Sequence, residues 1–177
     1  MKFLIITKKQ LMLALCAVLA LTAVAVGSVS VRAGNNRKLP IYCVGTDKKQ
    51  IAISFDAAWG NDDTQTLIDI LKEYDVPATF FVVGSWVDKY PESVKALSDA
   101  GHQVQNHSNT HPHMPQLSKA QMCDELESCN SKIEKITGVR PALHRPPYGD
   151  YDNMLIEAAE SLNMHTIQWS VDSLDWK

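Results

Sequence analysis

From residue 41 onward, short apolar runs of strand length alternate with longer segments in which apolar residues recur at helical spacing. Short runs rich in β-forming residues predict strands, and periodic segments that open with Ser, Asn or Asp predict helices. The predicted strands are residues 41–44, 51–55, 78–83, 102–106, 141–145 and 164–171. The predicted helices follow the polar residues at 61–64, cover 91–100, extend from Ser118 to Gly138, and cover 151–162.

This alternation of strands and helices predicts an α/β fold with a parallel sheet and crossover helices. In such folds, functional sites lie beyond the carboxyl ends of the strands. Polar clusters follow four of the predicted strands, and their first members are Asp56, His107, Arg145 and Asp172. We therefore expect side chains that are far apart in the sequence to converge at one edge of the sheet.

The first 32 residues have a different pattern and form a separate segment. Three lysines lie among the first nine residues, and no charged residue occurs from 11 to 31. This run is long enough for the roughly 20 apolar residues of a membrane-spanning helix, and its small residues near the end are also typical of a cleaved signal peptide. Signal anchor and signal peptide both stay open, with a buried helix as a third interpretation. The lysines predict a cytoplasmic N-terminus, so the remainder is expected to be extracytoplasmic, membrane-anchored or secreted.

The composition is that of a globular protein. Of the 177 residues, 45% are apolar and 21% charged, which excludes disordered and collagen-like classes. We interpret residues 33–40 as a linker and 41–177 as one domain. Without the N-terminal lysines, 14 basic and 20 acidic residues leave a net charge of −6, so no nucleic acid is expected as a partner.

Four cysteines are too few to define a disulfide scaffold. Cys123 and Cys129 are six residues apart on a predicted helix, so they point to different faces and are not expected to pair. Whether they are core thiols, or whether a bridge involves Cys43, stays open.

Two of the clusters suggest metal-assisted chemistry. His107 and His111 are four residues apart, and two imidazoles at this spacing are able to bind one metal ion. Asp56 follows an apolar strand directly, where a carboxylate is placed to take a proton from a metal-activated water. Taken singly, the histidines also fit ordinary surface or core residues, and Asp56 also fits a turn or helix cap.

The other two clusters contain an arginine and two acids. The loop Arg145-Pro-Pro-Tyr148-Gly149 is stiff, and its arginine is placed to hold Asp56 through a bidentate pair. In Asp172-Ser-Leu-Asp175-Trp176, the acids are suited to orienting a histidine and the tryptophan to walling a sugar ring. A structural turn and a helix cap are the simpler interpretations of these two segments.

In this order, the clusters over residues 41–177 resemble the polysaccharide deacetylase family of chitin, chitooligosaccharide and peptidoglycan deacetylases. Three segments are most similar to a sporulation-associated branch from Gram-positive bacteria: Ser-Phe-Asp-Ala-Ala-Trp-Gly, Arg-Pro-Pro-Tyr-Gly and Asp-Ser-Leu-Asp-Trp. The resemblance implies a distorted (β/α) barrel and metal-dependent removal of acetyl groups from N-acetylated sugars. It also implies a cell-wall glycan or chitin-like oligosaccharide as partner, besides a membrane reached through the N-terminal segment.

The resemblance also implies a role for each matching residue. His107 and His111 are expected to hold a divalent metal, usually zinc, and Asp56 to be the general base that Arg145 positions. The backbone N–H of Tyr148 is expected to help bind the oxyanion. Asp175 is expected to orient a general-acid histidine, and Trp176 to shape the pocket.

The sequence departs from the family pattern at two places. Ala57 stands where the family usually has a second Asp, its third metal ligand. Asp62 or Asp63 is better interpreted as a helix N-terminal acid than as a replacement. Asp56 as the third ligand is another alternative, which would leave the role of general base vacant. The chain also stops at Lys177, before the family's Leu-x-His segment that supplies the general acid. We therefore expect the barrel to be incomplete at its C-terminus and this 177-residue chain to be nearly inactive.

Two functions of different classes remain, and a third variant is close to the first. The leading hypothesis is a hydrolase that removes N-acetyl groups from cell-wall or chitin-like polysaccharide. The alternative is a degenerate deacetylase fold that binds glycan, or serves sporulation and morphogenesis, without activity. An esterase acting on O-acetyl groups would use the same residues.

Overall fold

The computed structural model describes residues 8, 9, 12, 17 and 37–174. The chain forms two compact units, Met1–Arg37 and Lys38–Lys177, and the second contains the sheet. The predicted signal or anchor segment thus lies almost entirely outside the described residues. Within the described part of the chain, no helix is long and apolar enough to cross a bilayer.

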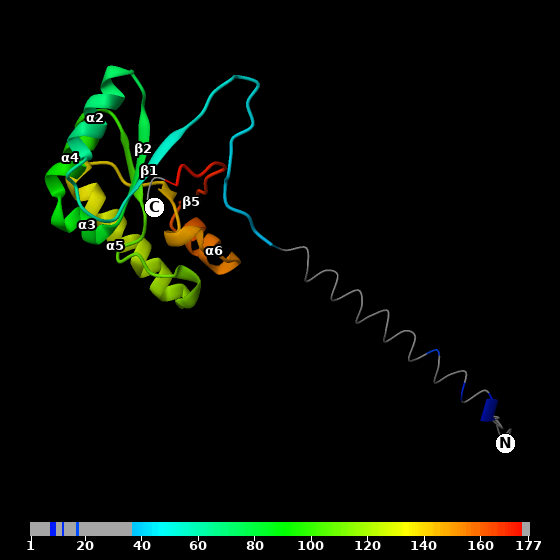
Figure 1. Ribbon diagram of the computed structural model, residues 1–177. Helices are drawn as coiled ribbons and strands as arrows, with labels where there is room; N and C mark the ends of the chain where they lie inside the picture. The colour runs from blue at the N-terminus through cyan, green and yellow to red at the C-terminus, as the bar shows by residue number, and fades with distance from the viewer. Residues whose placement is uncertain (1–7, 10–11, 13–16, 18–36, 175–177) are drawn as a thin grey trace. The chain divides into compact units, whose positions relative to one another are not determined.

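The second unit is built on a five-stranded parallel sheet in which the strand order follows the sequence (Figure 1). Its strands are β1 (Ile53–Ala57), β2 (Ala78–Val82), β3 (Gln103–Asn106), β4 (Leu143–His144) and β5 (His165–Thr166). Each connection places the next strand parallel to and beside the strand before it, as consecutive elements usually lie. The predicted α/β fold with a parallel sheet is confirmed.

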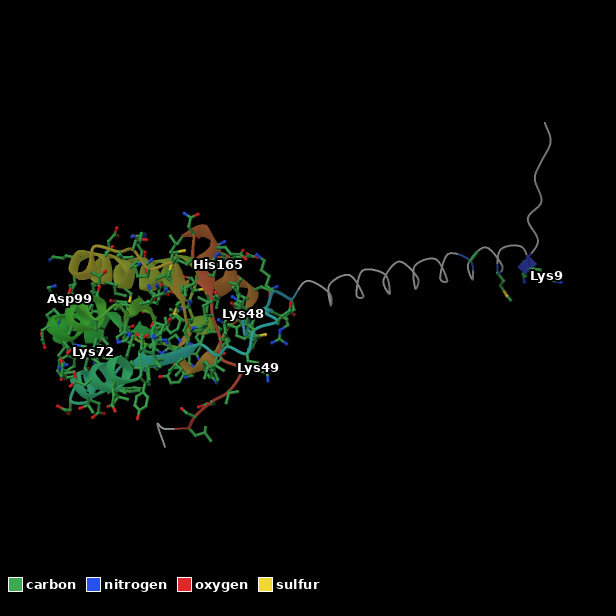
Figure 2. All side chains as sticks on the ribbon, turned by 90° about the horizontal axis from the view of Figure 1, so that it is seen from above. Lys9, Lys48, Lys49, Lys72, Asp99 and His165 are labelled. Atoms are coloured by element: carbon green, nitrogen blue, oxygen red, sulfur yellow. The ribbon has the colours of Figure 1, made fainter. Side chains whose placement is uncertain are left out.

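Five α-helices and two short 3₁₀ turns connect the strands. They are α2 (Thr64–Glu73), α3 (Gly84–Lys89), α4 (Pro91–Asp99), η1 (Met114–Gln116), α5 (Lys119–Thr137), η2 (Pro147–Gly149) and α6 (Asn153–Ser161). In Figure 2, Lys72 in the last turn of α2 and Asp99 at the end of α4 lie at the same end of the domain. Because α2 leads from β1 to β2, and α4 leads on from α3 to β3, both helices run back toward the amino ends of these parallel strands and leave the carboxyl ends free for a site.

The longest helix, α5, begins and ends where its sequence predicts. The Ser118 side chain accepts a hydrogen bond from the Gln121 backbone, and the Gln121 side chain accepts one from the Ser118 backbone, which is a capping box. Gly138 ends the helix in the left-handed conformation, with φ of 73°. The start of α2 differs from the prediction, because the Asp63 side chain makes no capping bond there.

Three other local predictions were wrong. The strand predicted at 41–44 is a single parallel bridge between Ile41 and Ile167, and the strand predicted at 164–171 shortens to the two residues of β5. Helix α3 was not predicted, because Gly84 was interpreted as the end of a strand rather than the start of a helix. A Cβ at Gly84 would overlap the Asn109 side chain, so the glycine lets a loop pack onto the helix start.

The apolar residues of the sheet face the helices. Phe80 and Val82 of β2 are buried in a cluster with Leu97 of α4 and Ile133 of α5. Because strand residues alternate between faces, Phe81 points away from this cluster, and the guanidinium carbon of Arg145 lies 4.1 Å from its ring centroid. A second cluster joins α5, α6 and η1 through buried side chains that include Met114, Met122, Leu126 and Leu155. The site therefore rests on a sheet that is buried on its helical side.

Candidate active site

Three side chains meet at the carboxyl edge of the sheet, as the strand-end argument predicts. Asp56 is the fourth residue of the five in β1, His107 directly follows β3, and Arg145 directly follows β4. The backbone N–H of Arg145 donates to the carbonyl of Asn106 at 2.9 Å, which links the carboxyl ends of β3 and β4. The parallel sheet thus brings together Asp56, His107 and Arg145, although 51 residues separate the first from the second and 38 the second from the third.

Arg145 is buried, with 5% of its surface exposed, and it organises Asp56. Its Nη1 donates to Oδ1 of Asp56 at 2.7 Å, and its Nη2 donates to Oγ of Ser54 at 2.6 Å. The predicted bidentate pair with Asp56 was therefore wrong. Ser54 lies two residues earlier on the same face of β1, so it receives the second arm of the fork. Oδ2 of Asp56 is not held by Arg145 and lies 3.8 Å from Nε2 of His107.

His107 is held in an orientation suited to binding at Nε2. Its Nδ1 lies 2.7 Å from the backbone carbonyl of Arg145, to which it donates, and it is 3% exposed. A hydrogen bond from one ring nitrogen to a carbonyl fixes the tautomer and leaves a lone pair on the other. Burial lowers the pKa of His107, although the nearby Asp56 carboxylate opposes this. The imidazole is consequently neutral at neutral pH, with Nε2 free to accept.

His111 lies beside His107 and between two aromatic side chains. The two imidazole centroids are 5.0 Å apart, and the His111 ring makes edge contacts with Trp59 at 5.3 Å and Tyr148 at 4.7 Å. Burial, and next the neighbouring His107, lower the pKa of His111, so this ring is also neutral at neutral pH. Trp59 is 81% exposed and was not singled out by sequence reasoning. Its position in the loop after Asp56 is the only signal that could have found it.

Tyr148 lies in η2 with a left-handed backbone, at φ of 60° and ψ of 4°. His113 stacks on its ring at 4.1 Å, and Nδ1 of His113 lies 3.2 Å from Oδ2 of Asp150. His113 is exposed. The stiff loop that carries Arg145 thus also brings Tyr148 against His111.

Of the other predicted residues, two lie outside the described part of the chain and the rest are exposed. Asp175 and Trp176 lie outside the described residues. Asp172 is exposed, and its Oδ1 accepts a hydrogen bond from the backbone N–H of Leu174 at 2.9 Å, which is a local turn contact. Asp62 and Asp63 are exposed just before α2.

The cysteines and Ala57 have structural surroundings. Cys123 and Cys129 are not bonded to each other, as predicted, and Cys43 is free and exposed. Burial raises the pKa of Cys129 to about 12, so this thiol stays protonated. Ala57, the last residue of β1, packs against the apolar cluster under the helices.

Residues 44–167 match the family model described as polysaccharide deacetylase. The chain belongs to the polysaccharide deacetylase family. Among its deacetylase relatives is the peptidoglycan-N-acetylmuramic acid deacetylase PdaA of Bacillus subtilis, which is 38% identical over 77% of this chain and 52% of that protein. The uncharacterized protein YlxY of the same bacterium is 36% identical over 78% of this chain and 43% of that protein.

The deacetylase fold is also matched by solved structures. A CE4 family pseudoenzyme from Bacillus anthracis has a TM-score of 0.76 and 38% identity, over 78% of this chain and 49% of that one. A mutant of the same pseudoenzyme, described as having restored enzymatic activity, has a TM-score of 0.76 and 39% identity, over 78% of this chain and 51% of that one. The chain spans about half the length of these relatives.

Deacetylases of this family are generally metal-dependent, and the site fits a metal in part. Neutral imidazoles at His107 and His111, with Nε2 of His107 unprotonated, are suitable donors. A catalytic zinc site normally has three protein ligands, and within residues 37–174 no three His, Cys, Asp or Glu side chains are grouped so that they could hold an ion. The described residues therefore fit a metal held by two imidazoles. The usual third ligand is not available at position 57, because alanine has no carboxylate.

Proposed function

We propose that this protein is a hydrolase that removes N-acetyl groups from cell-wall or chitin-like polysaccharide, a reaction at carbon–nitrogen bonds other than peptide bonds. The observation that carries the proposal is that the two carboxylate oxygens of Asp56 have different neighbours. One oxygen is held by Arg145 at 2.7 Å, and the other lies 3.8 Å from Nε2 of His107. A carboxylate is suited to general base catalysis when one oxygen is held in place and the other faces a histidine that is able to bind a metal.

In this proposal Asp56 takes the proton from the water that attacks the acetyl carbonyl. Its side chain is 34% exposed, so water and substrate can reach it. Arg145 is a positioning residue, because it touches Asp56 and Ser54 and is itself buried. Its charge keeps the carboxylate in one orientation, which favours proton transfer at Oδ2.

His107 and His111 would hold a divalent metal, with zinc as the expected ion. Such an ion supplies Lewis acidity, which polarises the carbonyl and lowers the pKa of water. The hydrogen bond from His107 to the Arg145 carbonyl supports this role, since it is the kind of outer contact that orients metal-ligating histidines. Orientation of the two imidazoles is thus the contribution of the chain itself.

The substrate would lie against the aromatic side chains around His111. Trp59 and Tyr148 are 81% and 59% exposed and flank this ring, so they offer apolar faces to a sugar. The backbone N–H of Tyr148 would donate to the developing oxyanion. The proposal also includes two residues outside the described part of the chain. Trp176 would form a second wall of the sugar site, and Asp175 would orient a general-acid histidine.

A degenerate deacetylase fold that binds glycan or serves sporulation without activity is the second candidate. It is favoured by Ala57, which removes the usual third metal ligand, and by the likeness to a CE4 family pseudoenzyme. Zinc affinity separates the two candidates, because an active site needs a metal that stays bound during turnover. Glycan binding with no metal bound at micromolar zinc supports the second candidate.

An extracytoplasmic location, with the N-terminal segment as anchor or cleaved signal, is part of the same proposal. Cell-wall glycan is outside the cytoplasm, so the two parts require each other. Protease treatment of intact cells tests this, because an extracytoplasmic domain is digested while cytoplasmic proteins survive.

The experiment that tests the proposed activity is acetate release from N-acetylated glycan after removal and return of zinc. It uses the full-length gene product rather than the 177-residue chain, which we expect to be nearly inactive. We expect chelation to abolish release and zinc to restore it. Release that is indifferent to chelation counts against the proposal.

A further inference from the structure

The loop from His107 to His111 has an unfavourable backbone that something must stabilise. Ser108 and His111 have positive φ values of 67° and 61°, a region that residues with a Cβ rarely occupy. The orientation of the two imidazoles depends on this backbone, because His111 is displaced from β3 by the turn at Ser108. Local strain of this kind persists only where surrounding contacts determine it.

Glu125 of α5 provides most of these contacts from the helix side. Its Oε2 accepts hydrogen bonds from the backbone N–H groups of Asn109 at 2.9 Å and Thr110 at 2.8 Å. Its Oε1 accepts one from Oγ1 of Thr110 at 2.8 Å. All three donors belong to residues between the two histidines, and Glu125 itself is half-buried.

The opposite side of the loop is held by the start of α3. The backbone N–H of Gly84 donates to the Ser108 carbonyl, and that of Ser85 donates to the Asn109 carbonyl, both at 2.9 Å. Lys132 adds a bond from Nζ to Oδ1 of Asn109 at 2.7 Å. The loop is therefore clamped between two helices, and the carboxylate of Glu125 is the one anionic acceptor in these contacts.

We propose that Glu125 is a positioning residue, which holds the loop so that His107 and His111 face the same ion. The proposal rests on the metal site of the proposed function. A carboxylate is required because the loop presents three donors to it, and each oxygen must accept. In Glu125→Gln, the amide nitrogen is itself a donor, so at least one loop donor loses its acceptor.

The test compares Glu125→Gln with Glu127→Gln in the full chain. Glu127 is on the same helix and pairs with Arg140 instead, so it is a matched control. In metal-free protein, we expect the amides of Asn109 and Thr110 to exchange with solvent at least about tenfold faster in Glu125→Gln, with β2 amides unchanged. Thr110→Val, which removes only the bond to Oε1, should accelerate exchange in the same loop to a smaller extent.

The second readout is the affinity for Co²⁺, followed by its absorption spectrum. We expect a loss of about 10–100-fold in Glu125→Gln, as for other changes behind metal-ligating histidines, and less than twofold in Glu127→Gln. Loop exchange equal to the control in both Glu125→Gln and Thr110→Val overturns the proposal. If wild-type protein binds no Co²⁺, the metal site of the proposed function fails, while the exchange rates still decide the role of Glu125.

Discussion

Arg145 holds Asp56 by one carboxylate oxygen, with Nη1 and Oδ1 2.7 Å apart. The same guanidinium donates to Ser54 through Nη2 and lies over the Phe81 ring, so its position is set by three contacts on the site face of the sheet. The free oxygen of Asp56 consequently has a defined direction, toward His107. Fixing one oxygen is what makes the other available for chemistry.

Replacement of Arg145 by lysine should damage this arrangement. A single ammonium cannot replace a planar fork that reaches Asp56 and Ser54 together. We expect a loss of about 1–3 kcal/mol in the free energy of unfolding, as for hydrogen bonds to charged groups, measured by urea denaturation. Arg140→Lys is the control, because Arg140 pairs with Glu127 and Glu134 at the surface, where ion pairs contribute about 1 kcal/mol or less. Equal losses in the two variants would show that the buried fork has no special importance.

Replacement of Ala57 by aspartate should strengthen metal binding. A carboxylate at this last residue of β1 is disfavoured against the apolar cluster under the helices and should turn toward the polar edge with the histidines. We expect zinc affinity to rise at least about tenfold, because a three-ligand site replaces a two-ligand one. Isothermal titration of wild type, Ala57→Asp and the uncharged control Ala57→Asn measures this. No gain over Ala57→Asn contradicts the assignment of residue 57 to the metal site.

His144 should make the protein sensitive to acid. Burial, and next the nearby His107, together lower the pKa of His144 to about 3. The folded protein therefore stays unprotonated there, while the unfolded chain binds a proton below the ordinary pKa of 6.5. Stability therefore falls as pH drops from about 6.5 toward 3, by about 1.4 kcal/mol per pH unit for one proton.

The matched variants for this effect are His144→Leu and His165→Leu. His165 is exposed on the neighbouring strand and is labelled in Figure 2. Urea denaturation between pH 6.5 and 4.5 should give a slope for His144→Leu that is smaller than wild type by about one proton. An unchanged slope in His144→Leu rejects the account of this residue.

Trp59 should contribute to glycan binding and not to folding. Its side chain is 81% exposed, so Trp59→Ala should change the free energy of unfolding by less than about 0.5 kcal/mol. Loss of an aromatic face beside His111 should weaken binding of an N-acetylglucosamine oligomer about tenfold, or ~1.4 kcal/mol. Tyr74→Ala is the control, since Tyr74 is 69% exposed at the end of α2, near the amino ends of the strands. Similar affinities for the two variants exclude Trp59 from the binding surface.

Much of the fold followed from local signals in the sequence. The alternation of strands and helices gave the parallel sheet, and Ser118, Gln121 and Gly138 gave both ends of α5. The same logic placed Asp56, His107 and Arg145 at one edge, because parallel strands end together. Helix α3 was not predicted, because a glycine usually ends an element. Here Gly84 begins the helix, and its lack of a side chain leaves room for Asn109 of the neighbouring loop.

The finer features of the site depend on partners distant in sequence. Ser54 takes one arm of Arg145 across 91 residues, and Glu125 reaches Thr110 from a helix 15 residues later. Neither contact could be predicted from the sequence, because serine and glutamate are common on strands and helices whatever side chain they bind. Burial also decided the state of His144, which is fully enclosed although its strand has only two residues.

The most direct test of the proposed mechanism is acetate release by the full-length protein, with zinc and N-acetylated peptidoglycan, for wild type and Asp56→Asn. Asparagine keeps an oxygen for Arg145, so the fold should survive, but it cannot accept the proton. We expect release to fall about 10²–10⁴-fold, whereas Asp62→Asn, an exposed acid before α2, should match wild type. Equal release by wild type and Asp56→Asn would contradict the role of this carboxylate as the base.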